Sequence, residues 1–312
     1  MSVPFISFDE GEARLDWLRL TEALAAGHAR PKAEIGDTFL RRGDDTILSR
    51  AAWIDGLGSL VKTATIHPGN AAAGLPSING AVSLFDDRTG VLAAMVDFHL
   101  VTKWKTAGDS LLGALRLARK DARKVLIVGA GTVARSLYEA FGAGFPDARF
   151  TIWNRTAAKA EALAAECPGM TVAEDLEAAV RDADIVVCAT MSTEPVIRGD
   201  WLQPGQHLNL IGAYRIDMRE VDDMALQRGR VFVDSFDTTI GHIGEIAIPL
   251  ESGAIARGDL LADFYQIEEM RRQEDSEITV FKNGGGAHLD LMTAQHILDQ
   301  WSDQAARLAP QS

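Results

Sequence analysis

The spacing of apolar and polar positions changes near Lys124. From there onward, short apolar runs alternate with stretches whose apolar residues recur every three or four positions. The first pattern predicts strands and the second predicts helices. The predicted strands are 124–128, 149–153, 184–190, 207–212 and 230–235, and the predicted helices are 131–145, 157–166 and 175–183. Alternation of this kind is typical of an α/β fold with a parallel, doubly wound sheet.

The pattern before residue 120 differs from the pattern that follows it. Residues 80–101 form two apolar runs around a turn at 87–90, which predicts a β-hairpin. Residues 105–120 have apolar positions at helical spacing and a basic end, as a helix C-terminus favours. The amphipathic segment 288–308 is expected to pack back on this part. The sequence therefore predicts two domains, 1–120 with 288–312 and 121–287.

Composition narrows the possible partners. The 312 residues are 47% hydrophobic and 24% charged, which is ordinary for a globular protein. The formal net charge of −13 disfavours nucleic acid and anionic membranes as partners. No apolar run approaches the roughly 18–20 residues that span a bilayer, and the first residues lack the pattern of a secretory signal. We therefore expect a cytoplasmic protein.

A glycine-rich segment carries the most specific signal. Directly after the strand 124–128 comes the G-x-G-x-x-A form of the dinucleotide-binding motif, Gly129-Ala130-Gly131-Thr132-Val133-Ala134. Its first glycine permits the tight turn, and its second lets the backbone approach a pyrophosphate. Its alanine allows close packing of helix on strand, and the helix N-terminus offers free amides to the anion. The sequence thus predicts a Rossmann-type nucleotide-binding domain.

The turn after the second predicted strand indicates which dinucleotide binds. Asn154, Arg155 and Thr156 lie about 20 residues beyond the motif, where the ribose is recognised. An acid there would favour NAD, whereas an arginine pairs with the 2′-phosphate of NADP, and the two polar neighbours can donate to it. We therefore predict NADP(H), with NAD(H) possible; the alternative is that Arg155 is a solvated surface residue. Thr190 and Tyr214, which follow later strands, complete the predicted cofactor site.

The cysteines and histidines argue against a metal site. Cys167 and Cys188 are far apart and lack ligand spacing, which suits reduced thiols. The seven histidines form no H-E-x-x-H pattern. His242 and His288 stand in glycine-rich segments that could line the cofactor site, although a loop histidine is more often structural.

Five stretches of the chain resemble the ornithine cyclodeaminase/mu-crystallin family. They are 56–70, 84–110, 125–134, 211–222 and 281–294. Members of this family include cyclodeaminases, ketimine and cyclic imine reductases, alanine dehydrogenases and mu-crystallin. The resemblance implies a homodimer. It also implies that the smaller α+β first domain, with the returning C-terminal helix, supplies dimerisation and substrate contacts, while the second domain binds a nicotinamide cofactor.

The resemblance also implies roles for individual residues. Lys62 matches the family lysine beside the substrate carboxylate and the reacting carbon–nitrogen group. Lys105 falls where the family has an arginine, and it therefore replaces a two-pronged fork with a point charge. Asp290 has family support near the active site. We take these three as the predicted catalytic residues. Lys32 falls near a further family arginine.

A departure from the family pattern favours reduction over deamination. Cyclodeaminases carry an aspartate where this chain has Tyr214, and a phenol with a pKa near 10 does not act as a base at neutral pH. The resemblance therefore implies an NADPH-dependent reductase that converts Δ1-pyrroline-2-carboxylate to L-proline, with Δ1-piperideine-2-carboxylate, giving L-pipecolate, as a second substrate. Two alternatives remain open: a cyclodeaminase or amino-acid dehydrogenase of the same fold, and a non-catalytic NADP(H)-binding protein like mu-crystallin.

Overall fold

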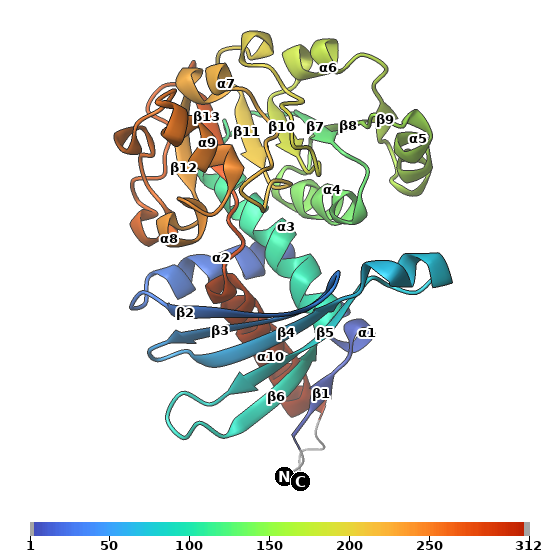
Figure 1. The fold of residues 1–312 in the computed structure, drawn as a ribbon, viewed down its shortest axis with the longest axis vertical. Coiled ribbons are helices and arrows are strands. Elements are labelled where there is room, and N and C mark those ends of the chain that lie inside the picture. Colours follow the sequence, from blue (N-terminus) through green and yellow to red (C-terminus); the bar gives the residue numbers. More distant parts are fainter. Residues whose placement is uncertain (1–2, 309–312) are drawn as a thin grey trace. The chain divides into compact units, whose positions relative to one another are not determined.

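The structure is a computed structural model that describes residues 3–308, and it forms two compact units (Figure 1). Unit 1 contains the described residues up to Lys105 and those from Gly286 onward. Unit 2 contains Thr106–Gly285. The boundary lies inside helix α3 (Phe98–Leu117), whereas the sequence-based boundary between 120 and 121 lies beyond the end of that helix.

A six-stranded sheet forms the frame of unit 1. Its order is β1-β6-β5-β4-β3-β2; neighbours from β2 to β6 are antiparallel and β1 is parallel to β6. The strands are β1 (Phe5–Ile6), β2 (Glu34–Arg42), β3 (Asp45–Ile54), β4 (Gly58–Ile66), β5 (Ile78–Phe85) and β6 (Leu92–Asp97). The pairing of β5 with β6 confirms the predicted hairpin.

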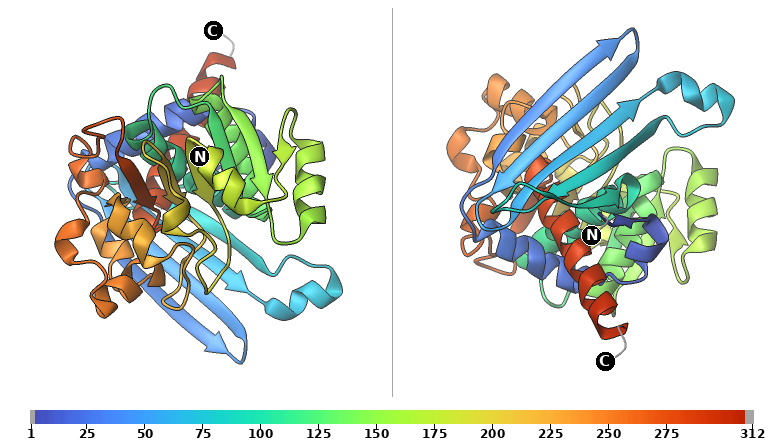
Figure 2. Two further views of the ribbon diagram at one scale, coloured as in Figure 1. Left: turned by 90° about the horizontal axis from the view of Figure 1, so that it is seen from above. Right: turned by 90° about the horizontal axis from the view of Figure 1, so that it is seen from below.

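Helices cover one face of this sheet. Helix α10 (Ala287–Leu308) crosses the face and contacts β2 to β5, and α2 (Trp17–His28) packs on α10 (Figure 2). The short α1 (Phe8–Glu12) and a 3₁₀ helix (Pro68–Ala73) complete the unit. The returning C-terminal helix therefore packs within unit 1, as its amphipathic pattern predicts.

The prediction of strand for residues 98–101 is wrong, because α3 begins at Phe98. The carboxylate of Asp97 accepts a hydrogen bond from the backbone N–H of Leu100 at 2.9 Å. An aspartate in this position satisfies an amide that the first helical turn leaves without a partner, and so it starts the helix. The early start places Lys105 on the helix rather than at its beginning.

A seven-stranded parallel sheet forms unit 2. Its order is β12-β13-β11-β10-β7-β8-β9. The strands are β7 (Lys124–Val128), β8 (Arg149–Trp153), β9 (Thr171–Val172), β10 (Ile185–Cys188), β11 (His207–Leu210), β12 (Gly229–Val233) and β13 (Ile278–Lys282). The predicted doubly wound fold is confirmed. The chain runs outward from β7 to β9 and then returns to β10, so the order reverses between β7 and β10. That reversal is where such sheets bind ligands.

Helices connect the strands of unit 2 (Figure 1). They are α4 (Thr132–Gly144), α5 (Ala157–Glu166), α6 (Leu176–Asp182), α7 (Asp223–Arg228), α8 (Phe236–Thr239) and α9 (Gly244–Ser252), with 3₁₀ turns at Gly199–Trp201, Arg257–Asp259 and Phe264–Gln266. The central strands are buried on both faces, which explains why they read as continuous apolar runs. Within residues 3–308, none of the helices combines the length and the apolarity needed to cross a bilayer.

Candidate active site and cofactor-binding site

Three predicted catalytic residues meet in unit 1. Asp290, in the first turn of α10, is fully buried. Its Oδ1 accepts a hydrogen bond from Nζ of Lys62 at 2.8 Å, and its Oδ2 accepts one from Nζ of Lys105 at 2.8 Å. Each carboxylate oxygen therefore holds one ammonium group, although the three residues are far apart in the sequence.

The register of the sheet adds a third cation, which the sequence analysis missed. Arg50 on β3 pairs directly with Lys62 on β4, so both side chains lie on the face that α10 covers. Like charges directly opposite each other destabilise a sheet. Asp290 offsets this repulsion, because its Oδ2 lies 4.0 Å from Nη1 of Arg50. We call Arg50, Lys62, Lys105 and Asp290 the cationic cluster.

Arg50 is the most accessible member of the cationic cluster. Its side chain is 24% exposed, compared with 5% for Lys62 and 8% for Lys105. Asp37 on β2 fixes the guanidinium, accepting from Nη2 at 2.9 Å and from Nε at 3.3 Å. The sequence does indicate that Arg50 faces inward, because it has the same strand periodicity as the buried Ala52 and Ile54. This periodicity is recognisable only once β3 is known to be a strand.

Lys62 is held by several neighbours. Its ammonium donates to Thr102 Oγ1 at 2.7 Å and to Asp290, and it lies 4.5 Å from the ring centroid of Phe98. An ammonium has three N–H protons, so these two bonds leave one proton for a ligand. Burial lowers the pKa of Lys62 to about 8, and Asp290 opposes part of that shift. A lysine with such a pKa can give up a proton near neutral pH.

The electrostatics of Asp290 keep it ionised. Burial alone would raise the pKa of this carboxyl, but Lys105, Lys62 and Arg50 hold it well below its usual range. Asp290 is therefore a permanent counter-charge that keeps the cations together. Lys32, by contrast, is exposed and does not belong to the cationic cluster.

The prediction that His288 stands in a loop is wrong. The glycine run ends at Gly286, and α10 starts at Ala287, so His288 is helical and fully buried in unit 1. Its ring meets that of His28 edge-on, with centroids 5.2 Å apart. Burial lowers the pKa of His288 well below its usual value, so the ring is neutral. His242 is exposed in unit 2.

The glycine motif has the geometry that a dinucleotide requires. Gly129 has φ +109°, and a Cβ there would lie 2.7 Å from the carbonyl oxygen of Ala189. Gly131 is the N-cap of α4, and a Cβ there would meet no described protein atom within 4 Å. Thr132 and Val133 form the first turn, and Ala134 is fully buried. The space beside Gly131 at the start of α4 is therefore open, as the close approach of a pyrophosphate demands.

The turn after β8 is organised by Asn154. Its Oδ1 accepts from the N–H of Ala130 at 3.0 Å, and its Nδ2 donates to the carbonyl of Thr156 at 2.9 Å. Asn154 thus connects the glycine motif to the turn, so its role in the structure is to hold the turn in place. Arg155 and Thr156 are exposed, and Arg155 forms no ion pair with another residue of the described chain. Both are accessible to a phosphate.

Thr190 and Tyr214 follow β10 and β11, at the same edge of the sheet as the glycine motif. The backbone N–H of Thr190 donates to Glu220 at 2.7 Å and its hydroxyl does so at 3.0 Å. Tyr214 is 57% exposed, and its ring lies 5.5 Å from the guanidinium carbon of Arg215. All predicted cofactor residues therefore lie at the carboxyl ends of strands, where doubly wound folds bind nucleotides.

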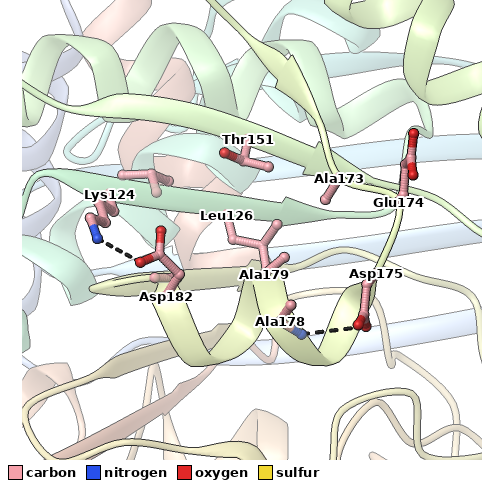
Figure 3. A pocket seen from close by; sticks show the side chains of 11 residues that line it. Lys124, Leu126, Thr151, Ala173, Glu174, Asp175, Ala178, Ala179 and Asp182 are labelled. Atoms are coloured by element: carbon pink, nitrogen blue, oxygen red, sulfur yellow. Dashed lines mark hydrogen bonds and ion pairs between the residues drawn. The ribbon is translucent and has the colours of Figure 1, made fainter.

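A separate pocket of about 300 Å³ lies in unit 2 (Figure 3). Its walls include Lys124 and Leu126 of β7, Thr151 of β8, and Ala178, Ala179 and Asp182 of α6. Lys124 and Asp182 form an ion pair of 2.6 Å at its edge. None of the predicted site residues lines this pocket. Among residues 3–308, no group of three or more His, Cys, Asp or Glu side chains is arranged to hold a metal ion.

Comparison with known proteins shows the family. The model of the ornithine cyclodeaminase/mu-crystallin family matches residues 55–305. The chain belongs to this family. It is 50% identical over 301 residues to the Δ1-pyrroline-2-carboxylate reductase of Paracoccus denitrificans, covering 94% of this chain and 95% of that relative. The resemblance inferred from the five stretches is therefore confirmed.

Solved structures of family members agree with this result. The Thermococcus litoralis Δ1-pyrroline-2-carboxylate reductase in complex with NADH and L-proline has a TM-score of 0.89 and 25% identity, over 97% of this chain and 98% of that one. An archaeal alanine dehydrogenase dimer with bound NAD has a TM-score of 0.88 and 25% identity, over 98% of both chains. These relatives confirm the predicted fold and the assignment of the chain to the nicotinamide-dependent oxidoreductases of its family.

Proposed function

We propose that this protein reduces Δ1-pyrroline-2-carboxylate to L-proline with NADPH, and Δ1-piperideine-2-carboxylate to L-pipecolate as a second reaction. The observation that carries the proposal is the cationic cluster, in which Lys62 and Lys105 each hold one oxygen of the buried Asp290 and Arg50 stands beside them. The 50% identity to a reductase of this name supports the substrate class. In this proposal unit 1 holds the substrate and unit 2 holds NADP(H).

The charge of the cationic cluster suits an imino acid. Three cations face two carboxylates, those of Asp290 and Asp37, which leaves one positive charge in excess. A substrate with one carboxylate completes the balance. The guanidinium of Arg50 is partly exposed and already donates to Asp37 through Nε and Nη2, while its Nη1 lies 4.0 Å from Asp290 Oδ2. In this proposal Arg50 adds its charge and a charge-assisted hydrogen bond from the Nη1 end to the substrate carboxylate.

The residues of unit 1 then prepare the imine for reduction. Arg50 and Lys105 neutralise the substrate carboxylate, and the remaining N–H proton of Lys62 bonds to the imine nitrogen. Protonation of that nitrogen draws electrons from C2 and makes it electrophilic. NADPH, when bound, supplies the hydride that C2 accepts. The proton that Lys62 gives to the imine nitrogen remains on the product amine, and water then reprotonates Lys62.

The glycine motif and the turn after β8 fit a nicotinamide dinucleotide. The amides at the start of α4 would hold the pyrophosphate, and Arg155 and Thr156 would hold the 2′-phosphate. Thr190 and Tyr214 would lie near the other half of the cofactor, because they follow β10 and β11. The preference for NADPH rests on Arg155.

The pKa of Lys62 predicts how activity depends on pH. The proposed role requires the protonated amine, and the pKa of Lys62 is about 8. We expect kcat/KM for imine reduction to be level below pH 8 and to fall by about tenfold per unit above it. Steady-state rates from pH 6 to about pH 10 test this, with the titration of the free imine measured separately. A level profile across the whole range would contradict the role of Lys62 as proton donor.

Replacing Arg155 with alanine is expected to change the preference between cofactors. The variant loses charge-assisted hydrogen bonds to the 2′-phosphate, which should lower kcat/KM with NADPH by roughly 10- to 100-fold. The value with NADH should change less than about twofold, because NADH lacks that phosphate. Arg149→Ala, at the exposed amino end of β8, is the matched control, because Arg155 follows the opposite end of this strand. Equal losses with both cofactors would refute the assignment of Arg155.

We also propose that unit 1 forms a homodimer through the face of its sheet that α10 leaves uncovered. Trp53, Leu40 and Ile47 are 54%, 63% and 42% exposed, and Val61 is 38% exposed next to them in the register. Exposed apolar side chains gathered on one face of a sheet are a common feature of association sites. A groove of about 360 Å³ includes Trp53 and Val61. The dimeric alanine dehydrogenase among the relatives supports the proposal.

A charge on this face should separate the protomers. In Trp53→Glu and Val61→Asp, a two-fold interface would bury each new carboxylate twice, close to its symmetry mate. We expect sedimentation equilibrium to give the monomer mass for both variants and the dimer mass for the wild type, with unchanged circular dichroism. Met224→Glu, an exposed apolar residue in unit 2, is the control. A dimer mass in both variants would place the interface elsewhere.

Turnover with both ring sizes tests the proposed function. NADPH oxidation is followed with each imine, with NADH in parallel, and ammonia release from L-ornithine is measured as the mark of a cyclodeaminase. We expect rapid NADPH consumption with the five-membered ring and no ammonia. Ammonia release without net cofactor use would replace the reductase with a deaminase.

A further inference from the structure

A single buried carboxylate joins two loops of unit 2. Glu220 is fully buried, and its Oε1 accepts from both the N–H and the hydroxyl of Thr190, at 2.7 and 3.0 Å. Its Oε2 accepts from the N–H groups of Gly212 and Ala213, at 2.6 and 3.3 Å. Thr190 follows β10, whereas Gly212 and Ala213 follow β11. Glu220 therefore connects the loops at the carboxyl ends of two central strands.

These loops are packed backbone against backbone. A Cβ on Gly212 would lie 1.8 Å from the carbonyl oxygen of Thr190. A Cβ on Gly129, in the glycine motif, would lie 2.7 Å from the carbonyl oxygen of Ala189. The loop after β10 therefore contacts the loop after β7 on one side and the loop after β11 on the other. The amides at such a junction are partly or fully shielded from water and need an acceptor, which Glu220 provides.

Glu220 is itself fixed by its surroundings. Its backbone N–H donates to Glu245 of α9 at 2.7 Å, and its carbonyl accepts from Val196 and Ile197 at 2.9 and 3.0 Å. The fully buried Lys282 ends β13 and donates to the carbonyl of Leu210 at 2.9 Å. Its positive charge lies close enough to interact with Glu220 and Glu245. A buried carboxylate with this many partners is held in one position.

We propose that Glu220 is a positioning residue that shapes the loops after β10 and β11 to receive the nicotinamide half of the cofactor. The inference rests on the proposed use of a nicotinamide dinucleotide. Doubly wound sheets are built from two mononucleotide-binding halves. The glycine motif and Arg155 belong to the half formed by β7, β8 and β9, which takes the adenosine end. The loops that Glu220 joins belong to the other half, and Glu220 acts on the ligand through them.

Two ligands that differ only at the nicotinamide end give a direct test. NADPH carries the nicotinamide, and 2′-phospho-ADP-ribose lacks it. In Glu220→Gln, an amide nitrogen replaces one acceptor oxygen and faces the loop N–H groups, so the loops must shift. We expect the Kd for NADPH to rise roughly tenfold or more. The Kd for 2′-phospho-ADP-ribose should stay within about twofold, because the adenosine half is untouched. Isothermal titration calorimetry measures both values.

Two further variants make the test decisive. Glu251→Gln, an exposed carboxylate of α9, should leave both Kd values unchanged. Glu220→Asp keeps the charge but shortens the side chain by one methylene, so that it cannot reach both loops, and it should weaken the binding of NADPH without weakening that of 2′-phospho-ADP-ribose. This variant carries the test if Glu220→Gln does not fold. Equal weakening of both ligands, or no weakening of NADPH, would overturn the proposal.

The comparison of the two Kd values does not depend on the substrate, because no imine is present in the titrations. The role of Glu220 can therefore be tested even if the protein does not reduce the proposed imines. If the wild type binds NADH in preference, the pair of NADH and ADP-ribose replaces the phosphorylated pair. A protein that fails to bind either dinucleotide would contradict the proposed function, whereas selective loss in the variant concerns Glu220 alone.

Discussion

Replacement of Lys62 with methionine is expected to lower kcat for imine reduction by about 10³-fold. Proton transfer from a positioned side chain contributes about 10²- to 10⁴-fold, and Lys62 also supplies one of the charges that attract the substrate. Methionine keeps most of the volume of the side chain and loses the amine. NADPH binding should be unchanged, because unit 2 holds the predicted cofactor residues.

The same substitution elsewhere in unit 1 gives the control for this result. Lys103 lies on α3 and pairs with Glu12, outside the cationic cluster. Lys103→Met should retain nearly full turnover. Initial rates under saturating NADPH, together with the NADPH Kd, separate loss of chemistry from loss of binding. A Lys62→Met enzyme with more than a tenth of the wild-type kcat would show that the proton comes from elsewhere.

Replacement of Asp290 with alanine is expected to destabilise the protein by about 3–5 kcal/mol. The substitution leaves Lys62, Lys105 and Arg50 close together without their shared counter-charge. The cost is large because these cations are buried or partly buried, where repulsion is weakly screened. We expect a lower urea midpoint and loss of imine reduction. Asp299→Ala, exposed on the same helix, should unfold like the wild type.

The contribution of Asp290 should also depend on pH in a defined direction. Its folded pKa lies well below its usual value, so the folded state binds fewer protons than the unfolded state in acid. The stabilisation is fully present above about pH 4 and declines as the pH falls towards the folded pKa. The difference in unfolding free energy between the wild type and Asp290→Ala should therefore shrink below about pH 4. A difference that stays constant down to about pH 2 would contradict the ion-pair origin.

The architecture of unit 2 was largely predictable because its signals are local. β7 and β8 are short apolar runs, and the glycine motif lies directly between a strand and a helix. β13 escaped prediction since its last residue, Lys282, is an unexpected side chain for a buried central strand. Its burial depends on the carbonyl of Leu210 and on carboxylates that come from other segments.

Unit 1 was harder to predict. β2 is exposed along its whole length, so it shows no alternation of buried and exposed positions that would mark it as a strand. The start of α3 depends on one capping aspartate, Asp97, and the apolar residues around it led to the prediction of a strand instead of a helix. Only pairing with neighbouring strands defines these segments, and pairing is not visible in a single sequence.

In the candidate site, too, some residues were predictable from the sequence and others were recognisable only in the folded structure. Lys62, Lys105 and Asp290 were identified through family motifs, and their assembly around one carboxylate is a property of the fold. Arg50 required the register that places it opposite Lys62. Glu220 required knowledge of which loops meet at the carboxyl edge of the sheet. Residues that act through partners distant in the sequence leave no local pattern.

The amount of L-proline formed from Δ1-pyrroline-2-carboxylate and NADPH tests the proposed reductase activity. We predict one L-proline for each NADPH oxidised, slower turnover with NADH, and loss of both signals in Lys62→Met. Purified protein that binds NADPH but oxidises it with neither ring size, and forms no L-proline, would contradict this activity.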